Sequence, residues 1–151
     1  MKIYRAYCNS AYDHIKKKGV AAISVSESGM TIVKKEVEKL SDTNNEVEMF
    51  AVQQTLKEIV GLNANEADMV FICTDFKLIH EAFERKWLQK WLQNGWKTSE
   101  GSPVKHRAYW SEIWNMSQKL RVDFKYENQK DVNLLSVLKK RAKKRLKSIN
   151  A

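Results

Sequence analysis

Three acidic residues are spaced so that the predicted secondary structure would carry them to the same end of a sheet. Glu48 lies in the first turn of a predicted helix, beside the apolar stripe of that helix. Asp75 directly follows a short apolar run, and open α/β sheets build their sites at the carboxyl ends of such strands. Asp131 stands at the start of the last predicted helix. Clustered carboxylates repel one another and need a cation, so this set predicts a site for divalent metal ions.

Each of these carboxylates also has an ordinary structural explanation. Glu48 could interact favourably with the helix dipole, and Asp75 could cap the helix that follows it. Asp131 could be an N-cap, which for that residue alone is the more frequent role. The joint placement of the three residues, rather than any one of them, favours the metal site.

Positive charge is concentrated in the second half of the chain. The sequence has 27 Lys and Arg against 18 Asp and Glu, a formal net charge of +9, and the excess lies in residues 76–151. A surface this basic attracts polyanions such as a nucleic-acid backbone through phosphate contacts. A surface tuned for solubility is the alternative, and charge alone does not separate the two.

The first half of the sequence alternates between strand and helix patterns. Three segments with alternating apolar residues, joined by short polar turns, predict an antiparallel meander. A helical stripe then runs from Glu46 to Gly61, after capping candidates at residues 41–45. The apolar run Asp68–Thr74 is typical of a strand buried on both faces, so a crossover onto a mixed sheet is expected. The three first strands are expected at Lys2–Cys8, Gly19–Ser26 and Met30–Val37.

Helical patterns dominate the second half. The fold class is therefore α/β, with a mixed five-stranded sheet of three antiparallel strands and then parallel strands, flanked by helices. The whole chain, residues 1–151, is expected to form a single domain. The later helices are expected at Phe76–Ala82, Phe83–Asn94, Lys105–Gln118 and Val132–Ser148, with one strand at Arg121–Tyr126.

The location of the protein is predicted from what the sequence contains. No apolar stretch is long enough to cross a bilayer, and the N-terminus lacks the apolar core of a secretory signal, so no membrane association is expected. Cys8 and Cys73 both lie in apolar runs, which favours buried, reduced thiols. These features predict a cytoplasmic protein.

Several stretches resemble motifs of bacterial-type ribonuclease H. Residues 43–49, TNNEVEM, look like its TNN-x-x-E motif, and residues 73–75, CTD, look like its S-T-D strand end. The longest match is residues 86–98, KWLQKWLQNGWKT, followed by PVK at 103–105. It resembles the Trp-rich basic handle of that family, W-x-x-x-W-x-x-x-G-W-K-T…P-V-K, and places a handle at about residues 83–105. The resemblance covers nearly the whole chain and implies a ribonuclease H-like fold.

This resemblance implies an endonuclease that hydrolyses the RNA strand of RNA–DNA hybrids with two Mg²⁺ ions, Mn²⁺ being a substitute. In that family four carboxylates hold the metal ions. Glu48 and Asp75 match the second and third of these. Asp131 matches the fourth when one residue is deleted relative to the usual Asn-x-x-x-Asp spacing; without the deletion, Val132 falls at that position.

The first of the four metal-binding positions departs from the family. The strand reads Tyr7-Cys8-Asn9-Ser10 where the family has T-D-G or C-D-A, so Asn9 takes the place of the first aspartate. An amide offers one neutral acceptor oxygen where a carboxylate offers two charged ones. We expect the chain as written to bind substrate and to cleave it very slowly. Asn9 is either an engineered inactivation or the mark of a natural, non-catalytic binding protein.

The resemblance also assigns residues to nucleic-acid contact. In the family the handle grips the DNA strand, and Trp87 and Trp91 share a helix face with Phe83 one turn earlier, although packing explains most of that stripe. Recognition by backbone and groove shape predicts little sequence specificity, and a monomer suffices for it. Thr43 is expected at a DNA phosphate, and Asn44 and Asn45 in the minor groove unless one of them caps the helix. The handle residues assigned to this contact are Lys86, Trp87, Lys90, Trp91, Trp96 and Lys97.

Two alternatives remain beside the hybrid endonuclease. The chain could be a ribonuclease-H-like module that binds hybrid or duplex without cutting it. It could also be a related nuclease fold that acts on a junction or on double-stranded RNA, although the long handle match argues against this. The basic run Lys139–Lys147 either extends the phosphate contacts or, as we favour, forms a partly solvated helix face.

Overall fold

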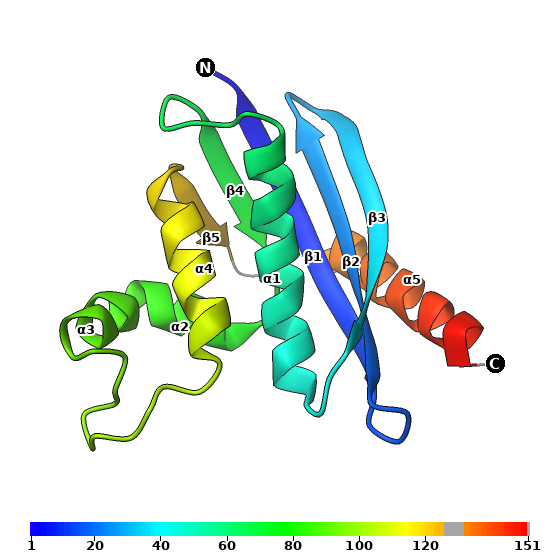
Figure 1. Cartoon of the computed structure of the whole chain (residues 1–151). Coiled ribbons are helices and arrows are strands. Elements are labelled where there is room, and N and C mark those ends of the chain that lie inside the picture. Colours follow the sequence, from blue (N-terminus) through cyan, green and yellow to red (C-terminus); the bar gives the residue numbers. More distant parts are fainter. Residues whose placement is uncertain (126–131, 151) are drawn as a thin grey trace.

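One mixed sheet of five strands organises the structure, a computed structural model that describes residues 1–125 and 132–150 (Figure 1). The strand order is β3-β2-β1-β4-β5, so the first strand is the central one. β1, β2 and β3 pair antiparallel, whereas β4 and β5 continue the sheet in parallel on the other side of β1. The predicted fold class is confirmed. The strands are β1 (Ile3–Asp13), β2 (Lys18–Glu27), β3 (Met30–Leu40), β4 (Met69–Cys73) and β5 (Val122–Lys125).

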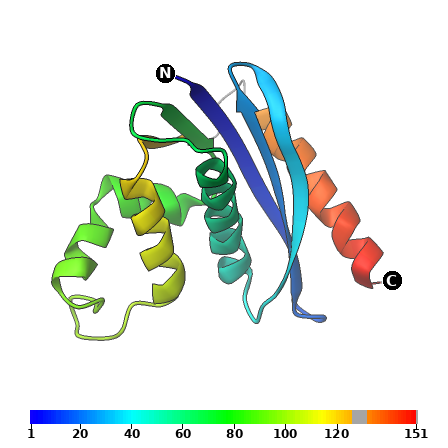
Figure 2. The same ribbon diagram turned by 45° about the horizontal axis from the view of Figure 1, so that its top comes forward.

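Helices cover both faces of this sheet. α1 and α4 lie on one face, α5 lies on the opposite face, and α2 and α3 extend beside α4 (Figures 1 and 2). None of the helices in the described ranges is both long enough and apolar enough to span a membrane. The helices are α1 (Asn44–Gly61), α2 (Lys77–Glu84), α3 (Trp87–Gln93), α4 (Arg107–Gln118) and α5 (Val132–Asn150).

The alternation of side chains along β1 divides the core into two. Successive residues of a strand point to opposite faces, so Cys8 packs under α1 and Ala11 packs under α5. The α1 side is the larger cluster and includes residues from β1, β2, β4 and all of the first four helices. The α5 side is small, and its helix is anchored by Leu138, Ala142 and Leu146 against β1 and β2. Asn9 follows Cys8 in β1, so its side chain points to the α5 side, where its amide contacts that helix.

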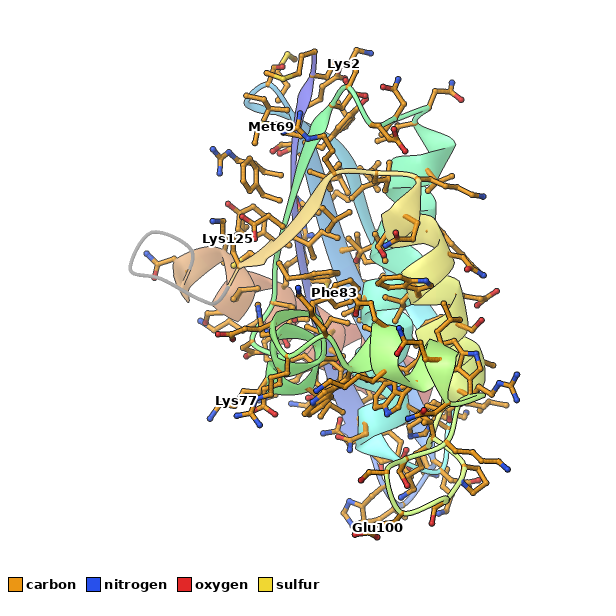
Figure 3. The ribbon with its side chains drawn as sticks, turned by 90° about the vertical axis from the view of Figure 1, so that its left-hand side faces the viewer. Lys2, Met69, Lys77, Phe83, Glu100 and Lys125 are labelled. Carbon is orange, nitrogen blue, oxygen red and sulfur yellow. The ribbon has the colours of Figure 1, made fainter. Side chains whose placement is uncertain are left out.

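Two sequence-based boundaries were wrong, and each has a physical reason. β1 was expected to end at Cys8, but its pairing with β2 continues to Asp13 opposite Lys18. The helix expected over residues 83–94 is broken, because Lys86 has a left-handed backbone with φ of 57°. Phe83 therefore belongs to α2 and is not one helical turn before Trp87. Its ring packs on Phe124 of β5 instead, with centroids 4.6 Å apart (Figure 3).

A glycine allows α1 to approach the sheet closely. A Cβ atom added at Gly19 of β2 would lie only 2.5 Å from Val47 Cγ2 of α1, which is nearer than non-bonded carbons come. Val47 is fully buried, and Glu48 follows it in the chain. The absence of a side chain at Gly19 therefore lets the first turns of α1 lie close to the sheet. It also sets the distance between Glu48 and the sheet.

Gly19→Ala is expected to destabilise the protein by about 1–3 kcal/mol, because the new methyl group overpacks against Val47. Adding Val47→Ala is expected to recover part of this loss by making room. Gly61→Ala is the matched control, since nothing lies within 4 Å of a Cβ there. Urea unfolding measures the effect, and equal stability of the Gly19 and Gly61 variants would contradict it.

Candidate metal and nucleic-acid site

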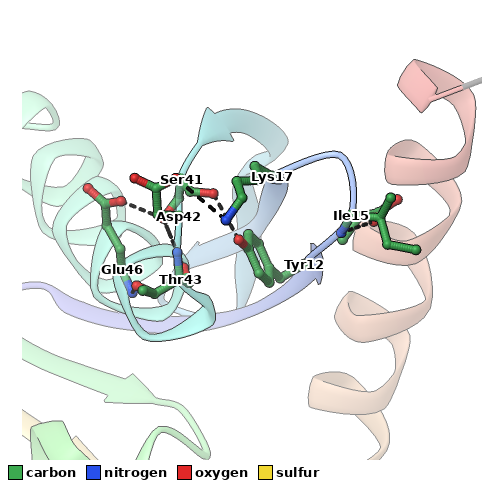
Figure 4. Close-up of polar contacts among 8 residues, drawn as sticks. Tyr12, Ile15, Lys17, Ser41, Asp42, Thr43 and Glu46 are labelled. Carbon is green, nitrogen blue, oxygen red and sulfur yellow. Dashed lines mark hydrogen bonds and ion pairs between the residues drawn. The ribbon is translucent and has the colours of Figure 1, made fainter.

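The first turn of α1 is fixed by side-chain hydrogen bonds (Figure 4). Thr43 is the N-cap, and its Oγ1 accepts from the backbone N–H of Glu46 at 3.2 Å. Ser41 Oγ accepts from Thr43 N at 3.1 Å and donates to the Glu46 carboxylate. This is a capping box in which a serine hydroxyl carries the reciprocal contact. The expectation that Asn44 or Asn45 might cap the helix is wrong, because Thr43 already does so.

Contacts from two other elements hold this turn in place. Tyr12 of β1 donates its hydroxyl to Ser41 O at 2.9 Å, and Tyr109 of α4 donates to Glu46 Oε2 at 3.2 Å. Thr43, Asn44 and Asn45 are exposed on the outer side of the turn. The start of α1 is therefore rigid while its polar side chains remain open to a ligand.

Asp75 is positioned by the end of β4. Thr74 Oγ1 accepts from Phe76 N at 3.2 Å, and the ring Nε2 of the buried His80 lies 2.8 Å from Thr74 O. Both bonds brace the turn from β4 into α2 and leave the Asp75 carboxylate exposed. No pattern in the sequence indicated the burial of His80 under this turn.

Asn9 links the central strand to the last helix. Its Nδ2 donates to Leu135 O of α5 at 3.0 Å, and its Oδ1 accepts from Ser10 N at 2.9 Å. The residue is 9% exposed. One acceptor lone pair of the amide oxygen is therefore already engaged, and the amide nitrogen faces a carbonyl that a carboxylate would repel.

Lys139 of α5 enters the same region, which the sequence analysis missed. Its Nζ donates to Ser10 O of β1. Burial and the charge of Asp75 raise the pKa of Glu48, and the charge of Lys139 offsets part of that rise. In the sequence it is one of many lysines in a basic run, and only the packing of α5 distinguishes it from its neighbours.

The two carboxylates and β1 are electrostatically coupled. Burial raises the pKa of Glu48, and the charge of Asp75 raises it further. Burial raises the pKa of the Cys8 thiol to about 11, and hydrogen bonds from Thr55 and Thr74 oppose the shift while the charges of Asp75 and Glu48 add to it. The charges of Glu48 and Asp75 therefore act on each other and on Cys8, the residue before Asn9 in β1.

A hard divalent cation fits the chemistry of this pair, since the two carboxylates repel and supply oxygen ligands. Glu48 and Asp75 would hold it, with the Asn9 amide oxygen as a neutral third ligand. Within residues 1–125 and 132–150, no group of three or more His, Cys, Asp or Glu side chains could hold a metal ion. Asp131, the predicted fourth ligand, lies outside the described residues, so it stays a prediction.

The handle residues surround an open cleft of about 350 Å³ beside α3. Trp87 and Trp91 are half-buried, and their ring centroids lie 5.9 Å apart. Lys90 and Lys97 are exposed at the border of the cleft. The loop after α3, which carries Glu100, lies at the opposite end of the molecule from Lys2 and Met69 (Figure 3). The cleft is lined by Trp87, Lys90, Trp91, Asn94, Lys97, Thr98 and Ser99.

Two handle residues, Trp96 and Lys86, do not line the cleft. Trp96 is 8% exposed and packs in the larger core, where its ring lies 6.5 Å from that of Trp91. This placement favours a packing role, in which Trp96 supports the cleft from below. Lys86 is exposed at the left-handed turn between α2 and α3 and does not line the cleft.

Glu48→Gln is expected to stabilise the metal-free protein at pH 7. The fold raises the pKa of Glu48, so its ionised form is disfavoured in the folded state relative to the unfolded chain. This cost is absent when the pH is below the pKa of the unfolded chain, about 4.3. It grows as the pH rises from there toward the pKa that Glu48 has in the folded protein. Since the side chain is only partly buried, the gain at pH 7 is expected to be no more than about 1 kcal/mol.

Urea unfolding in EDTA at pH 7 and at pH 3.5 tests whether Glu48→Gln stabilises the protein. The gain from Glu48→Gln is expected at pH 7 and not at pH 3.5. Glu66→Gln, at an exposed carboxylate, is the control and is expected to show no such difference. A Glu48→Gln variant less stable than the parent at pH 7 would refute the coupling described here.

Comparison with known proteins relates this arrangement to one family. Residues 1–128 match the RNase H family. A protein named Ribonuclease H from Nitratidesulfovibrio vulgaris is 34% identical over 84 residues, which cover 56% of this chain and 51% of that protein. Ribonuclease H of Thermus thermophilus is also 34% identical over 84 residues, which cover 56% of this chain and 48% of that protein. The matched segment thus spans about half the length of these relatives.

Solved structures share the fold at lower identity. The N-terminal RNase H domain of a Mycobacterium tuberculosis protein superposes with a TM-score of 0.70 at 15% identity, covering 99% of both chains. LC11-RNase H1, solved in complex with an RNA/DNA hybrid, gives a TM-score of 0.63 at 13% identity, covering 95% of this chain and 99% of its own. At these identities the likeness establishes the common fold.

Proposed function

The chain belongs to the RNase H family, and on that basis we propose that it is an endonuclease acting on the RNA strand of RNA–DNA hybrids. The observation that carries this proposal is that Glu48 lies near the start of α1 and Asp75 directly follows β4, whose last residue pairs with Tyr7 of β1, two residues before Asn9. The name Ribonuclease H of the bacterial relatives and the hybrid bound to LC11-RNase H1 support the choice of substrate.

Glu48 and Asp75 would bind divalent cations next to the phosphate to be cleaved. Asn9 and Asp131 complete the proposed ligand set for two Mg²⁺ ions, with Mn²⁺ as a substitute. The chemistry that such ions supply is activation of the attacking water and neutralisation of charge on the phosphate. The residues of the chain fix the position of the reaction, because the cap of α1 and the turn after β4 hold the carboxylates rigidly.

Asn9 weakens this chemistry in the chain as written. Its amide is neutral, and its oxygen already accepts from Ser10 N. The proposed site thus lacks a charged, bidentate group at the position of Asn9. Slow cleavage combined with normal binding is the expected consequence.

The cleft beside α3 is the proposed grip on the DNA strand. Lys90 and Lys97 supply phosphate contacts, and the exposed edges of Trp87 and Trp91 face the deoxyribose. Thr43 Oγ1 accepts from Glu46 N but keeps its own proton, which it can donate to a phosphate. Asn44 and Asn45 lie exposed beside it and are proposed to reach the minor groove, where 2′-hydroxyls are accessible.

The second candidate function is hybrid or duplex binding without cleavage. The hydrogen bond from Asn9 to Leu135 favours it, because the amide serves the packing of α5 in a way that an aspartate could not. In this reading the handle and the start of α1 keep their roles and the carboxylates have no reaction to perform.

Asn9→Asp decides between these functions. The variant is expected to cleave the RNA strand of a labelled hybrid in the presence of Mg²⁺ at least about 100-fold faster than the parent, since catalytic metal charge is worth several kcal/mol. The double variant Asn9→Asp/Asp75→Asn controls for contaminating nucleases and is expected to be inactive. If the parent and Asn9→Asp both bound the hybrid and neither cleaved it, only the binding function would remain.

Lys90→Ala is expected to weaken hybrid binding by about threefold to tenfold and to lower the salt slope of the affinity by about one, since one phosphate contact is lost. Lys57→Ala, at an exposed lysine near the C-terminal end of α1, removes the same charge outside the cleft. Fluorescence anisotropy at several salt concentrations measures both. Identical salt slopes for the two variants would rule out the proposed grip.

A further inference from the structure

The last helix carries a concentration of positive charge away from the handle. Seven of the nine residues from Lys139 to Lys147 are Lys or Arg, in a chain whose formal net charge is +9. The sequence of α5, from Val132 to Asn150, contains no Asp or Glu. Lys–Glu pairs three or four residues apart stabilise a solvated helix, whereas like charges at these spacings destabilise it. The repulsion within this run is relieved when an anion binds across it.

The packing of α5 fixes which of these cations face outward. A buried apolar stripe fastens the helix to β1 and β2. Four lysines follow the i, i+3, i+4, i+7 spacing of a single helix side, away from that stripe, and all four are exposed. These residues, called the outer stripe below, are Lys140, Lys143, Lys144 and Lys147.

Other basic residues of α5 have partners in the sheet. Arg145 forms an ion pair with Glu38 of β3 at 2.8 Å, and Lys139 Nζ donates to Ser10 O of β1. In the part of the chain that the structure describes, no ion pair includes a lysine of the outer stripe. The outer stripe is therefore available to an external anion.

The outer stripe and the handle lie on different sides of the molecule. α5 covers one face of the sheet, whereas α1 and α4 cover the other and α3 extends beside α4 (Figures 1 and 2). The cleft that Lys90 and Lys97 border is beside α3. Phosphates bound in that cleft are therefore not those that would reach the outer stripe.

The outer stripe fits a phosphodiester backbone in charge and in length. At 1.5 Å per residue it is about 10 Å long, and the phosphates of one strand follow each other by about 3.4 Å along a duplex, so it spans about three base-pair steps. A helix that lies on a membrane surface instead exposes large apolar residues beside its cations. Of the described side chains of α5, only Val137 is both large and apolar and exposed. This composition favours nucleic acid over lipid.

We propose that the outer stripe is a second nucleic-acid-binding surface, which holds the backbone of a duplex on the face of the sheet opposite the handle. The contact is electrostatic and independent of base sequence. One chain can then hold two duplexes, or two segments of one long duplex, at the same time. A solvated helix face without a ligand, which the sequence favoured, is the alternative. Cleavage plays no part in this binding.

Duplex binding by a variant without the handle cations tests the outer stripe by itself. Lys90→Ala/Lys97→Ala removes the two lysines at the border of the cleft and is expected to keep binding a short fluorescein-labelled DNA duplex at low salt in EDTA. Adding Lys140→Gln/Lys144→Gln is expected to weaken the affinity about tenfold and to lower its salt slope by about two, since two phosphate contacts are lost. Fluorescence anisotropy measures both. Absence of binding before the glutamines are introduced, or no effect of the glutamines, would overturn the proposal.

Two matched variants in the same background separate local charge from other effects. Lys140→Arg/Lys144→Arg keeps the charge and is expected to bind the duplex no more than about twofold more weakly. Lys57→Gln/Lys119→Gln removes two exposed cations outside α5 and is expected to stay within about twofold, because distant exposed charges are screened. A loss in either variant as large as that of the glutamine pair in α5 would contradict the assignment to the outer stripe.

Flotation with vesicles of phosphatidylserine and phosphatidylcholine tests the competing ligand. The chain is expected to bind these vesicles more weakly than the DNA duplex, since the outer stripe has no apolar anchor beside it. Vesicle binding that Lys140→Gln/Lys144→Gln abolishes, together with unchanged duplex binding, would assign α5 to a membrane surface and refute the proposal.

Discussion

The open edge of β1 beyond the end of β4 is the constraint on which the site depends. Backbone groups removed from solvent need partners, and β4 ends beside Tyr7 while β1 continues. Side chains of Asn9 and Lys139 satisfy Ser10 there, and the chain leaving β4 brings Asp75 to the same place. A longer β4 would complete the ladder along this edge of β1.

Close packing and capping turn this opening into a defined site. Gly19 lets α1 settle on β2, and Thr43 fixes where that helix begins. Together they determine the height and rotation of Glu48 above the sheet. On the other face, α5 is anchored by an apolar stripe, which gives Lys139 its position. The candidate site is therefore built from both layers of the fold, with β1 between them.

Opposite charges lie in separate parts of the structure. The exposed lysines Lys90 and Lys97 lie at a cleft floored by tryptophans, and the larger core supports these rings from below. The carboxylate of Glu48 lies at the sheet, where burial and the charge of Asp75 raise its pKa. A change at Asn9 therefore does not alter the residues that line the cleft.

The sequence by itself determined the mixed sheet of three antiparallel and then parallel strands, and it placed Glu48 near the start of a helix and Asp75 after a strand, because these follow from local periodicity and from the ends of apolar runs. The order of the strands in the sheet came from the structure. The sequence did not determine the length of β1 or the break at Lys86, since pairing with β2 and a single left-handed residue decide them. Nor did it distinguish Lys139 from Lys140 in a uniformly basic run. Only the packing of α5 against β1, a contact across more than a hundred residues of chain, turns one of these two lysines toward the backbone oxygen of Ser10.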